Sequence, residues 1–216
     1  MLSPEEKRQL QDAMTAVRLR ASQALGHANG AAQAVAFVGT LHGNLDAVIT
    51  ASEAAGPPPD CKPGCASCCH ARVEVSDPEA LHIGACLRQL PAPEQQALIG
   101  RLRAKARDEG ASLRQRLPCA FLRDGLCSIY AIRPAVCRKA HSLSAQACQS
   151  GADDIPQDLN RVIRCEVLMA GTREAYDSVG LPASCHELSA AVLAALDRDA
   201  LADWHRGKPL LETPQP

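Results

Sequence analysis

This sequence has few aromatic side chains and no excess of positive charge. Only 2% of its 216 residues are aromatic, and the formal net charge at pH 7 is −1, with a pI of about 6.6. Such a chain lacks the surplus of lysine and arginine that neutralises phosphates and the rings on which bases stack. The composition therefore argues against a nucleic-acid partner.

A membrane-spanning run and a secretory signal are also missing. No uninterrupted apolar stretch approaches the roughly 20 residues that cross a bilayer. The N-terminal MLSPEEKRQL places acidic residues where a signal peptide carries basic and then apolar ones. Neither a basic amphipathic face nor a lipidation motif indicates a membrane surface. We therefore expect a cytoplasmic protein with no membrane partner.

Cysteine, in contrast, is abundant, with 11 residues in the chain. Disulfides are rare in a reducing cytoplasm, and an odd number leaves one thiol unpaired in any scheme of disulfides alone. The 46% apolar fraction is rich in alanine, whose side chain buries little area at about 25 cal/mol per Å². Because such a core gains from a bound metal as a cross-link, the cysteines are interpreted as metal ligands.

Apolar periodicity predicts a mainly α-helical protein without alternating strands and helices. Ser3 and Pro4 mark the start of the first helix, and GPPPD at residues 56–60 forms an extended spacer after the second. Helices are expected at residues 4–25, 31–55, from Pro78 onward, 92–117, 157–177 and 185–206, with a strand at 71–76 and a short helix after Arg133-Pro134. The inner positions of the helix at 92–117 are Leu98, Leu102, Leu113 and Leu117.

The expected fold is a helical bundle around an irregular, metal-stapled cysteine segment, with one or two short strands at most. The chain is expected to divide into an N-terminal helical hairpin (1–56), a cysteine-cluster metal-binding core (57–151) and C-terminal helices that pack on this core (152–216).

The first cysteine cluster is CKPGCASCCH at residues 61–70. Pro63-Gly64 predicts a turn that folds Cys61 back toward Cys65. Cys68 and Cys69 are adjacent, and adjacent side chains on a helix point about 100° apart. These two thiols can therefore serve different sites, one ligand in each.

The second cluster is PCAFLRDGLCSIYAIRPAVCR at residues 118–138, and it supplies Cys119, Cys127 and Cys137. The residues at 123–125 predict a tight turn that returns Cys127 toward Cys119, and Pro134 predicts a helix start that presents Cys137. Cys148 follows eleven residues later. Two groups of four thiols match one tetrahedral zinc site each, or an iron–sulfur cluster with additional thiols.

The remaining cysteines are predicted to be small buried apolar residues, as lone cysteines usually are: Cys86, Cys165 and Cys185. His70 and His141 adjoin the clusters, and a supporting or surface role is favoured over metal ligation. Arg133, Arg138 and Lys139 either balance thiolate charge or form a solvated helix end.

The stretch CKPGCASCC followed by CAFLRDGLCSIYAIRPAVCR resembles the YkgJ-like cysteine-cluster family, over about residues 61–148. This resemblance implies a domain that chelates zinc or iron. It assigns Cys148 as the eighth cysteine, with Cys165 as the competing choice. The matching cysteines are Cys61, Cys65, Cys68, Cys69, Cys119, Cys127 and Cys137. Ile129, Tyr130, Arg133, Pro134 and Arg138 match the surrounding motif.

The same cysteine cluster is similar to that of bacterial flagellin lysine methylases, where an iron–sulfur cluster is implied. No Gly-rich loop marks a pocket for a methyl donor here. Three functions therefore stay open: a metal-binding protein for zinc or iron, including an iron–sulfur cluster; a related protein-modifying enzyme; and a metal carrier or redox sensor. The sequence names no protein partner.

Overall fold

The computed structural model describes residues 3–62, 64–111, 116–152 and 154–212. These residues form a mainly helical fold, as predicted, with four short strands where one or two were expected. The helices are α1 (Pro4–Gly26), α2 (Ala31–Ala36), α3 (Val38–Ala55), α4 (Asp77–Leu87), α5 (Ala92–Ala111), α6 (Ala135–Lys139), α7 (Ala145–Ser150), α8 (Leu159–Ser178), α9 (Leu188–Ala195) and α10 (Ala200–His205). Short 3₁₀ helices are η1 (Ser67–His70) and η2 (Tyr130–Ile132), and the strands are β1 (Glu74–Ser76), β2 (Leu122–Arg123), β3 (Leu126–Cys127) and β4 (Cys185–Glu187).

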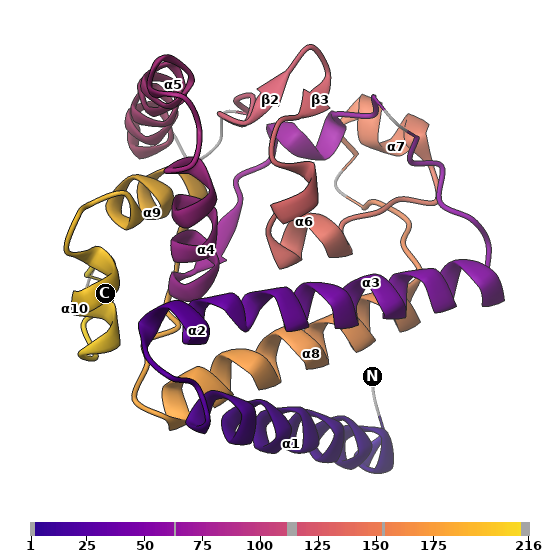
Figure 1. Cartoon of the computed structure of the whole chain (residues 1–216). Helices are drawn as coiled ribbons and strands as arrows, with labels where there is room; N and C mark the ends of the chain where they lie inside the picture. The colour runs from indigo at the N-terminus through magenta and orange to yellow at the C-terminus, as the bar shows by residue number, and fades with distance from the viewer. Residues whose placement is uncertain (1–2, 63, 112–115, 153, 213–216) are drawn as a thin grey trace.

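Helix α1 begins at the predicted cap. The Glu6 N–H donates to Ser3 Oγ at 3.2 Å, and the Ser3 N–H donates to the Glu6 carboxylate at 2.7 Å, which forms a capping box. Ala21 and Leu25 on the inner face are buried. Helix α8 contacts both α1 and α3 and lies between them in Figure 1. These three helices form one layer of the molecule.

Helices α1 and α8 approach each other closely at Gly171. A Cβ added there would lie 2.8 Å from the Met14 carbonyl oxygen and 2.8 Å from Val17 Cβ. The Met14 oxygen belongs to the backbone of a long helix, so it cannot move aside as a flexible side chain can. Only glycine therefore fits at this crossing.

We expect Gly171→Ala to lower the free energy of unfolding by about 1–3 kcal/mol, because it overpacks this crossing. Urea denaturation would measure the loss. Gly100→Ala on α5 is the matched control, since no neighbouring heavy atom lies within 4 Å of its added Cβ. That control should stabilise the protein slightly, through helix propensity alone. A Gly171→Ala variant as stable as the control would contradict the close crossing.

Residues 31–55 are long and apolar enough, by length and composition alone, to cross a membrane. Part of this stretch is packed in the fold, and 33% of its most apolar window is buried. Leu41 and Leu45 on α3 are buried against Ala135 of α6 and Cys165 of α8. This stretch is therefore a partly packed helical element of the structure, broken once at Phe37 between α2 and α3.

The main core gathers most of the few aromatic residues. The Tyr176 ring lies 6.2 Å from Phe37 and 6.1 Å from Trp204, measured between ring centroids. Tyr176 Oη also donates to the Ala34 carbonyl at 2.8 Å. Because aromatic rings bury large areas, this cluster joins α2, α8 and α10 around small side chains.

Two expected helices differ from the structure. The helix predicted at 185–206 begins instead with β4, where His186 pairs with Val75 of β1 in an antiparallel sheet. Glu187 then caps α9, because its carboxylate accepts from the Ser189 and Ala190 N–H groups at 2.9 Å. The pairing of β4 with β1 joins segments far apart in sequence, so the periodicity of either segment does not reveal it.

The helix predicted at 92–117 stops earlier. Leu98 and Leu102 are buried as expected, but Leu117 lies in an irregular segment and Leu113 lies outside the described residues. Lys105 Nζ donates to the Leu117 carbonyl at 2.6 Å. The chain therefore returns alongside α5 toward the second cysteine cluster.

Candidate metal centre

The first cysteine cluster ends in η1, which carries Cys68 and Cys69. A 3₁₀ helix has about three residues per turn, so the Cα–Cβ bonds of adjacent residues start about 120° apart, yet these two thiols lie close enough to hydrogen-bond to each other. A hydrogen bond between the two thiols lowers the pKa of Cys68 and raises the pKa of Cys69. Ahead of η1, the Cys65 N–H donates to the Lys62 carbonyl at 2.8 Å, and Gly64 has a φ of +87°. The predicted turn is thus present, while Pro63 lies outside the described residues.

The second cluster begins with the predicted hairpin. Asp124 and Gly125 have φ values of 50° and 77°, which give the left-handed turn that short hairpins favour. Leu122 of β2 pairs with Cys127 of β3, and the Leu122 N–H donates to the Cys119 carbonyl at 3.0 Å. The turn therefore returns Cys127 toward Cys119, as predicted.

Helix α6 presents Cys137 and starts directly after Pro134, as predicted. Its first N–H, on Ala135, donates to Glu79 Oε1 at 2.7 Å. Glu79 comes from α4, is only 7% exposed, and also accepts from Ser76 Oγ at 2.8 Å. Burial alone would raise the Glu79 pKa, but the nearby His42 ring and the donors on Ala135 and Ser76 hold this pKa below its usual range.

Glu79 was not among the predicted site residues. Its local signal was the spacing Ser76-x-x-Glu79, which is typical of a capping box. That signal places Glu79 at the start of α4 but gives no hint of its bond to α6. We class Glu79 as a positioning residue, because it holds the helix that carries Cys137.

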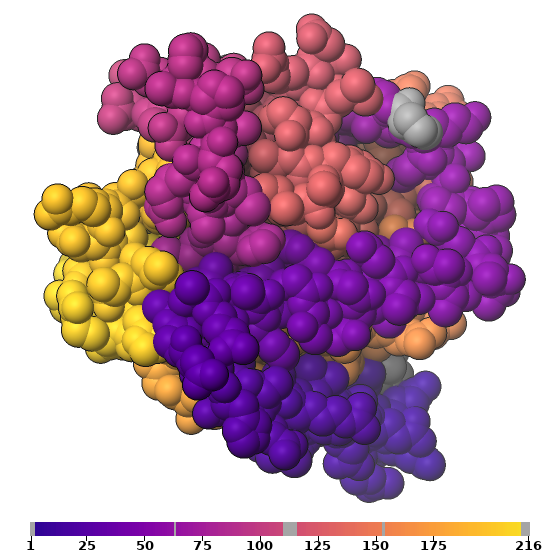
Figure 2. Space-filling model, in the orientation of Figure 1, coloured from indigo at the N-terminus to yellow at the C-terminus, as the bar shows by residue number. Residues whose placement is uncertain are grey.

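Backbone hydrogen bonds join the two clusters. The Cys119 N–H donates to the Cys69 carbonyl at 2.7 Å. The Asp60 N–H donates to the Ser142 carbonyl at 2.9 Å, and the Asp60 carboxylate accepts from the Ala145 N–H at 3.1 Å. Segments separated by about fifty or more residues in the sequence therefore lie side by side. In Figure 2 the segment around α6 fills the space between α4–α5 and α3.

The thiols of the two clusters lie in one region, in which Cys68 has neighbours on two sides: burial together with the charge of Cys68 raises the pKa of Cys61 and also those of Cys127 and Cys137. Burial raises the pKa of Cys61, and the charges of Cys65, Cys68 and Cys148 raise it further. Burial together with the charges of Cys119, Cys68 and Cys127 raises the pKa of Cys137 to about 12. We name the outer thiol group as Cys61, Cys65, Cys68 and Cys148, and the inner thiol group as Cys69, Cys119, Cys127 and Cys137.

The two groups differ in exposure. Cys61, Cys65 and Cys68 of the outer group are exposed, whereas all four inner thiols are half-buried. Within the described residues, no three cysteine, histidine or acidic side chains are arranged closely enough to hold a metal ion as they stand. The donor set itself is suitable, because thiolates are preferred ligands of zinc and of iron in iron–sulfur clusters.

The other cysteines lie apart from these groups. Cys165 is fully buried among Leu41, Leu45 and Ala135, as predicted for an apolar core residue. Cys86 is half-buried and Cys185 is exposed, so the prediction of burial is wrong for Cys185. Its position in β4 turns the sulfur outward, where it accepts from Arg173 Nη1 at 3.4 Å.

Histidine 141 uses both ring nitrogens within the protein. Nδ1 donates to the Lys139 carbonyl at 3.0 Å, and Nε2 accepts from the Asp158 N–H at 2.9 Å. His141 therefore supports the start of α8, which agrees with the supporting role favoured by the sequence. His70 Nδ1 donates to the Ala66 carbonyl at 3.0 Å, within the first cluster.

The cationic residues of the second motif have distinct contacts. Arg138 is buried and pairs with the Asp46 carboxylate of α3 at 2.8 Å. Lys139 pairs with Glu166. The Arg133 guanidinium carbon lies 3.9 Å from the centroid of the Tyr130 ring. Burial raises the pKa of Cys127, and the charge of Arg133 offsets part of this rise. Arg138 thus fastens α6 to α3, while Arg133 acts on a thiol.

Comparison with protein families gives one match to this arrangement. The model of the CxxCxxCC family, described as "Putative zinc- or iron-chelating domain", matches residues 60–168, about half of the chain. No significant match was found among curated proteins or solved structures. The matched residues include both cysteine clusters and end within α8. The chain therefore belongs to the CxxCxxCC family of metal-chelating domains.

Proposed function

We propose that this protein binds zinc or iron at two adjacent thiol sites, one formed by the inner thiol group and one by the outer. The observation that carries this proposal is the hydrogen bond from the Cys119 N–H to the Cys69 carbonyl, which brings the two clusters into contact. The proposal assigns Cys68 and Cys69, which are adjacent on η1, to different sites, and metal binding at both sites would replace the hydrogen bond between their thiols. The proposed ligands are Cys61, Cys65, Cys68 and Cys148 for the outer site, and Cys69, Cys119, Cys127 and Cys137 for the inner site.

The inner site is proposed to be structural. Its four thiols come from η1, the segment before β2, β3 and α6, so a bound metal would cross-link all of these elements. Metal binding at such a site contributes directly to the free energy of folding.

The outer site is proposed to exchange its metal. Three of its four thiols are exposed, so a competing ligand can reach the ion from solvent. This accessibility supports a carrier or sensor role in addition to the structural one. Free thiols of this kind require a reducing compartment, and we propose the cytoplasm.

The test is metal analysis of protein purified without oxygen, followed by timed release to a chelator. We expect two steps of release: a fast step that leaves the helical signal unchanged, and a slow step that lowers it. Cys148→Ser should remove only the fast step. A brown colour with visible charge-transfer absorption would identify an iron–sulfur cluster, whereas stoichiometric zinc in a colourless sample would identify zinc.

A single release step, or a fast step unaffected by Cys148→Ser, would contradict the division into two sites. Cys185→Ser is the matched control, because Cys185 is exposed but lies on β4, outside both thiol groups. Its release curve should equal that of the unmodified protein.

A further inference from the structure

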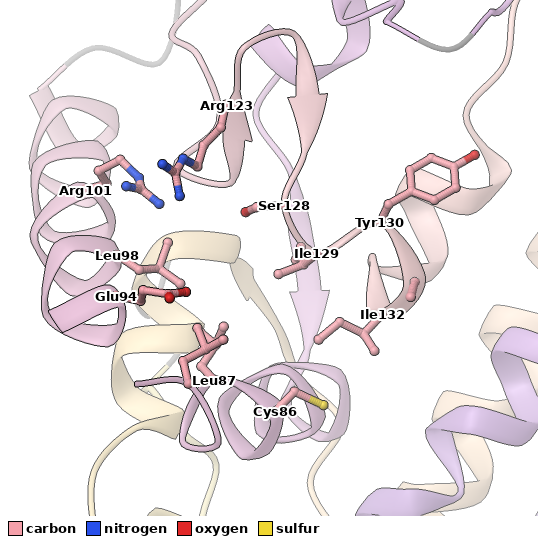
Figure 3. A pocket seen from close by; sticks show the side chains of 12 residues that line it. Cys86, Leu87, Glu94, Leu98, Arg101, Arg123, Ser128, Ile129, Tyr130 and Ile132 are labelled. Carbon is pink, nitrogen blue, oxygen red and sulfur yellow. The ribbon is translucent and has the colours of Figure 1, made fainter. Parts of the chain in front are cut away.

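A pocket of about 320 Å³ lies between α4–α5 and the segment from β2 to η2. Figure 3 shows side chains from these elements facing a common space. Its volume is at the small end of the range of about 300–1,000 Å³ that is usual for ligand pockets. None of the eight proposed metal ligands lines this pocket. It is therefore a separate feature from the thiol groups.

One wall of the pocket is apolar. Leu87 from α4, Leu98 from α5 and Ile129 from the segment after β3 contribute side chains that are otherwise buried. An apolar group placed against them would be removed from water, which is favourable by about 25 cal/mol per Å². The wall thus suits the hydrocarbon part of a ligand.

One end of the pocket, next to Leu98 in Figure 3, carries two guanidinium groups. Arg101 and Arg123 point toward each other in Figure 3. Arg101 Nε donates to the Ala120 carbonyl at 3.0 Å, which fixes this side chain and leaves its terminal N–H groups for other partners. The ion pairs of the described residues include neither arginine. Two facing cations repel each other, so an anion between them would be stabilised.

The charges of the pocket residues indicate which polar groups a ligand can carry. Paired arginine forks match the oxygens of a carboxylate or a phosphate. Glu94 lies on the apolar side, near Leu98. This carboxylate would repel a second anionic group at the far end of the ligand. The pocket therefore suits a molecule with one anionic head and an uncharged apolar body.

We propose that this pocket binds a small amphiphilic anion, with its carboxylate or phosphate head between Arg101 and Arg123 and its apolar body against Leu87, Leu98 and Ile129. The site is independent of the proposed metal function. Residues 128–132, which directly follow Cys127 in the chain, line the pocket. The pocket therefore lies next to the inner thiol group.

The test is calorimetric titration of the full, metal-loaded chain with octanoate, octyl phosphate and octanol below their aggregation concentrations. We expect saturable binding of one or both anions, and at least tenfold weaker binding of octanol. The anion that binds more tightly identifies the head group. Arg123→Gln should weaken anion binding at least tenfold, because Arg123 is an exposed residue whose guanidinium has no described ion pair.

Arg103→Gln is the matched control, since Arg103 is exposed on the same helix as Arg101 but does not line the pocket. Its affinity should be unchanged. Ser128→Leu is a second variant that fills the pocket while keeping both arginines, and it should also abolish binding. Octanol binding equal to that of the anions, unchanged affinity in Arg123→Gln, or no binding of either anion would overturn the proposal.

Discussion

Replacing Cys137 with serine should reduce the affinity for zinc or iron by more than about 100-fold. Removal of a residue that only hydrogen-bonds to a metal ligand typically reduces affinity by roughly 10–100-fold, and loss of a ligand should have a larger effect. Cys137 lies on α6 within the inner thiol group, and burial, together with the charges of neighbouring thiols, raises its pKa to about 12. Its thiol therefore stays protonated at neutral pH until a metal displaces the proton. Serine offers a much poorer ligand for either metal, and the inner site would lose one of its four donors.

Competition with a chromophoric chelator measures this affinity directly. Since metal uptake must release the Cys137 proton, affinity should also rise with pH in the unmodified protein, and this dependence should weaken in Cys137→Ser. Cys165→Ala is a suitable control, because Cys165 is buried in the apolar core and has no part in either thiol group. Unchanged metal content and affinity in Cys137→Ser would exclude Cys137 as a ligand.

Glu79→Gln should lower the free energy of unfolding by about 3 kcal/mol, since hydrogen bonds to a charged group contribute about 1.5–3 kcal/mol each. The buried Glu79 carboxylate accepts from Ala135 and Ser76. An amide accepts only with its oxygen, so if that oxygen faces the Ala135 N–H, the amide N–H group faces Ser76, whose backbone N–H loses the acceptor that it has at 3.3 Å. Chemical denaturation at neutral pH measures the loss.

The same variant should bind metal more weakly, although it retains every thiol, because the start of α6 would no longer be held against α4. The Glu79 pKa is lowered, so its stabilisation is present above the unfolded pKa and is lost as pH falls through the folded pKa. The stability difference between variant and unmodified protein should therefore narrow in acid. Glu174→Gln is the control, since Glu174 is exposed and its ion pair with Arg18 is long, at 3.9 Å between Oε2 and Nε. If Glu79→Gln lowered the free energy of unfolding and the metal affinity no more than Glu174→Gln does, the positioning role of Glu79 would be contradicted.

The parts of the fold that sequence predicts well are those with local signals. The cap at Ser3, the turn at Asp124-Gly125 and the helix start after Pro134 each depend on neighbouring residues, and all three are present. The turns that bend each cluster back on itself are also local, whereas the meeting of the two clusters depends on long-range bonds such as that from the Cys119 N–H to the Cys69 carbonyl.

The parts that were missed depend on contacts between distant segments. Glu79 has an ordinary capping role in its own helix, and its bond to Ala135 arises only once α4 and α6 meet. Arg138 resembles a solvated helix end in the sequence but is buried against Asp46 of α3. The strand β4 needs β1 as its partner. None of these pairings produces a periodic pattern or a change of composition in the sequence, so none could be predicted from it.

The crossing of α1 and α8 has a consequence for how the chain folds during synthesis. Helix α1 is made before α8, which follows only after more than a hundred further residues. Because synthesis adds roughly 5–20 residues per second, the apolar face of α1 stays without its α8 partner for several seconds. All eight proposed ligands are made before α8 begins. Metal captured on the ribosome could therefore order the middle of the chain first and give the late helix a surface on which to enclose α1.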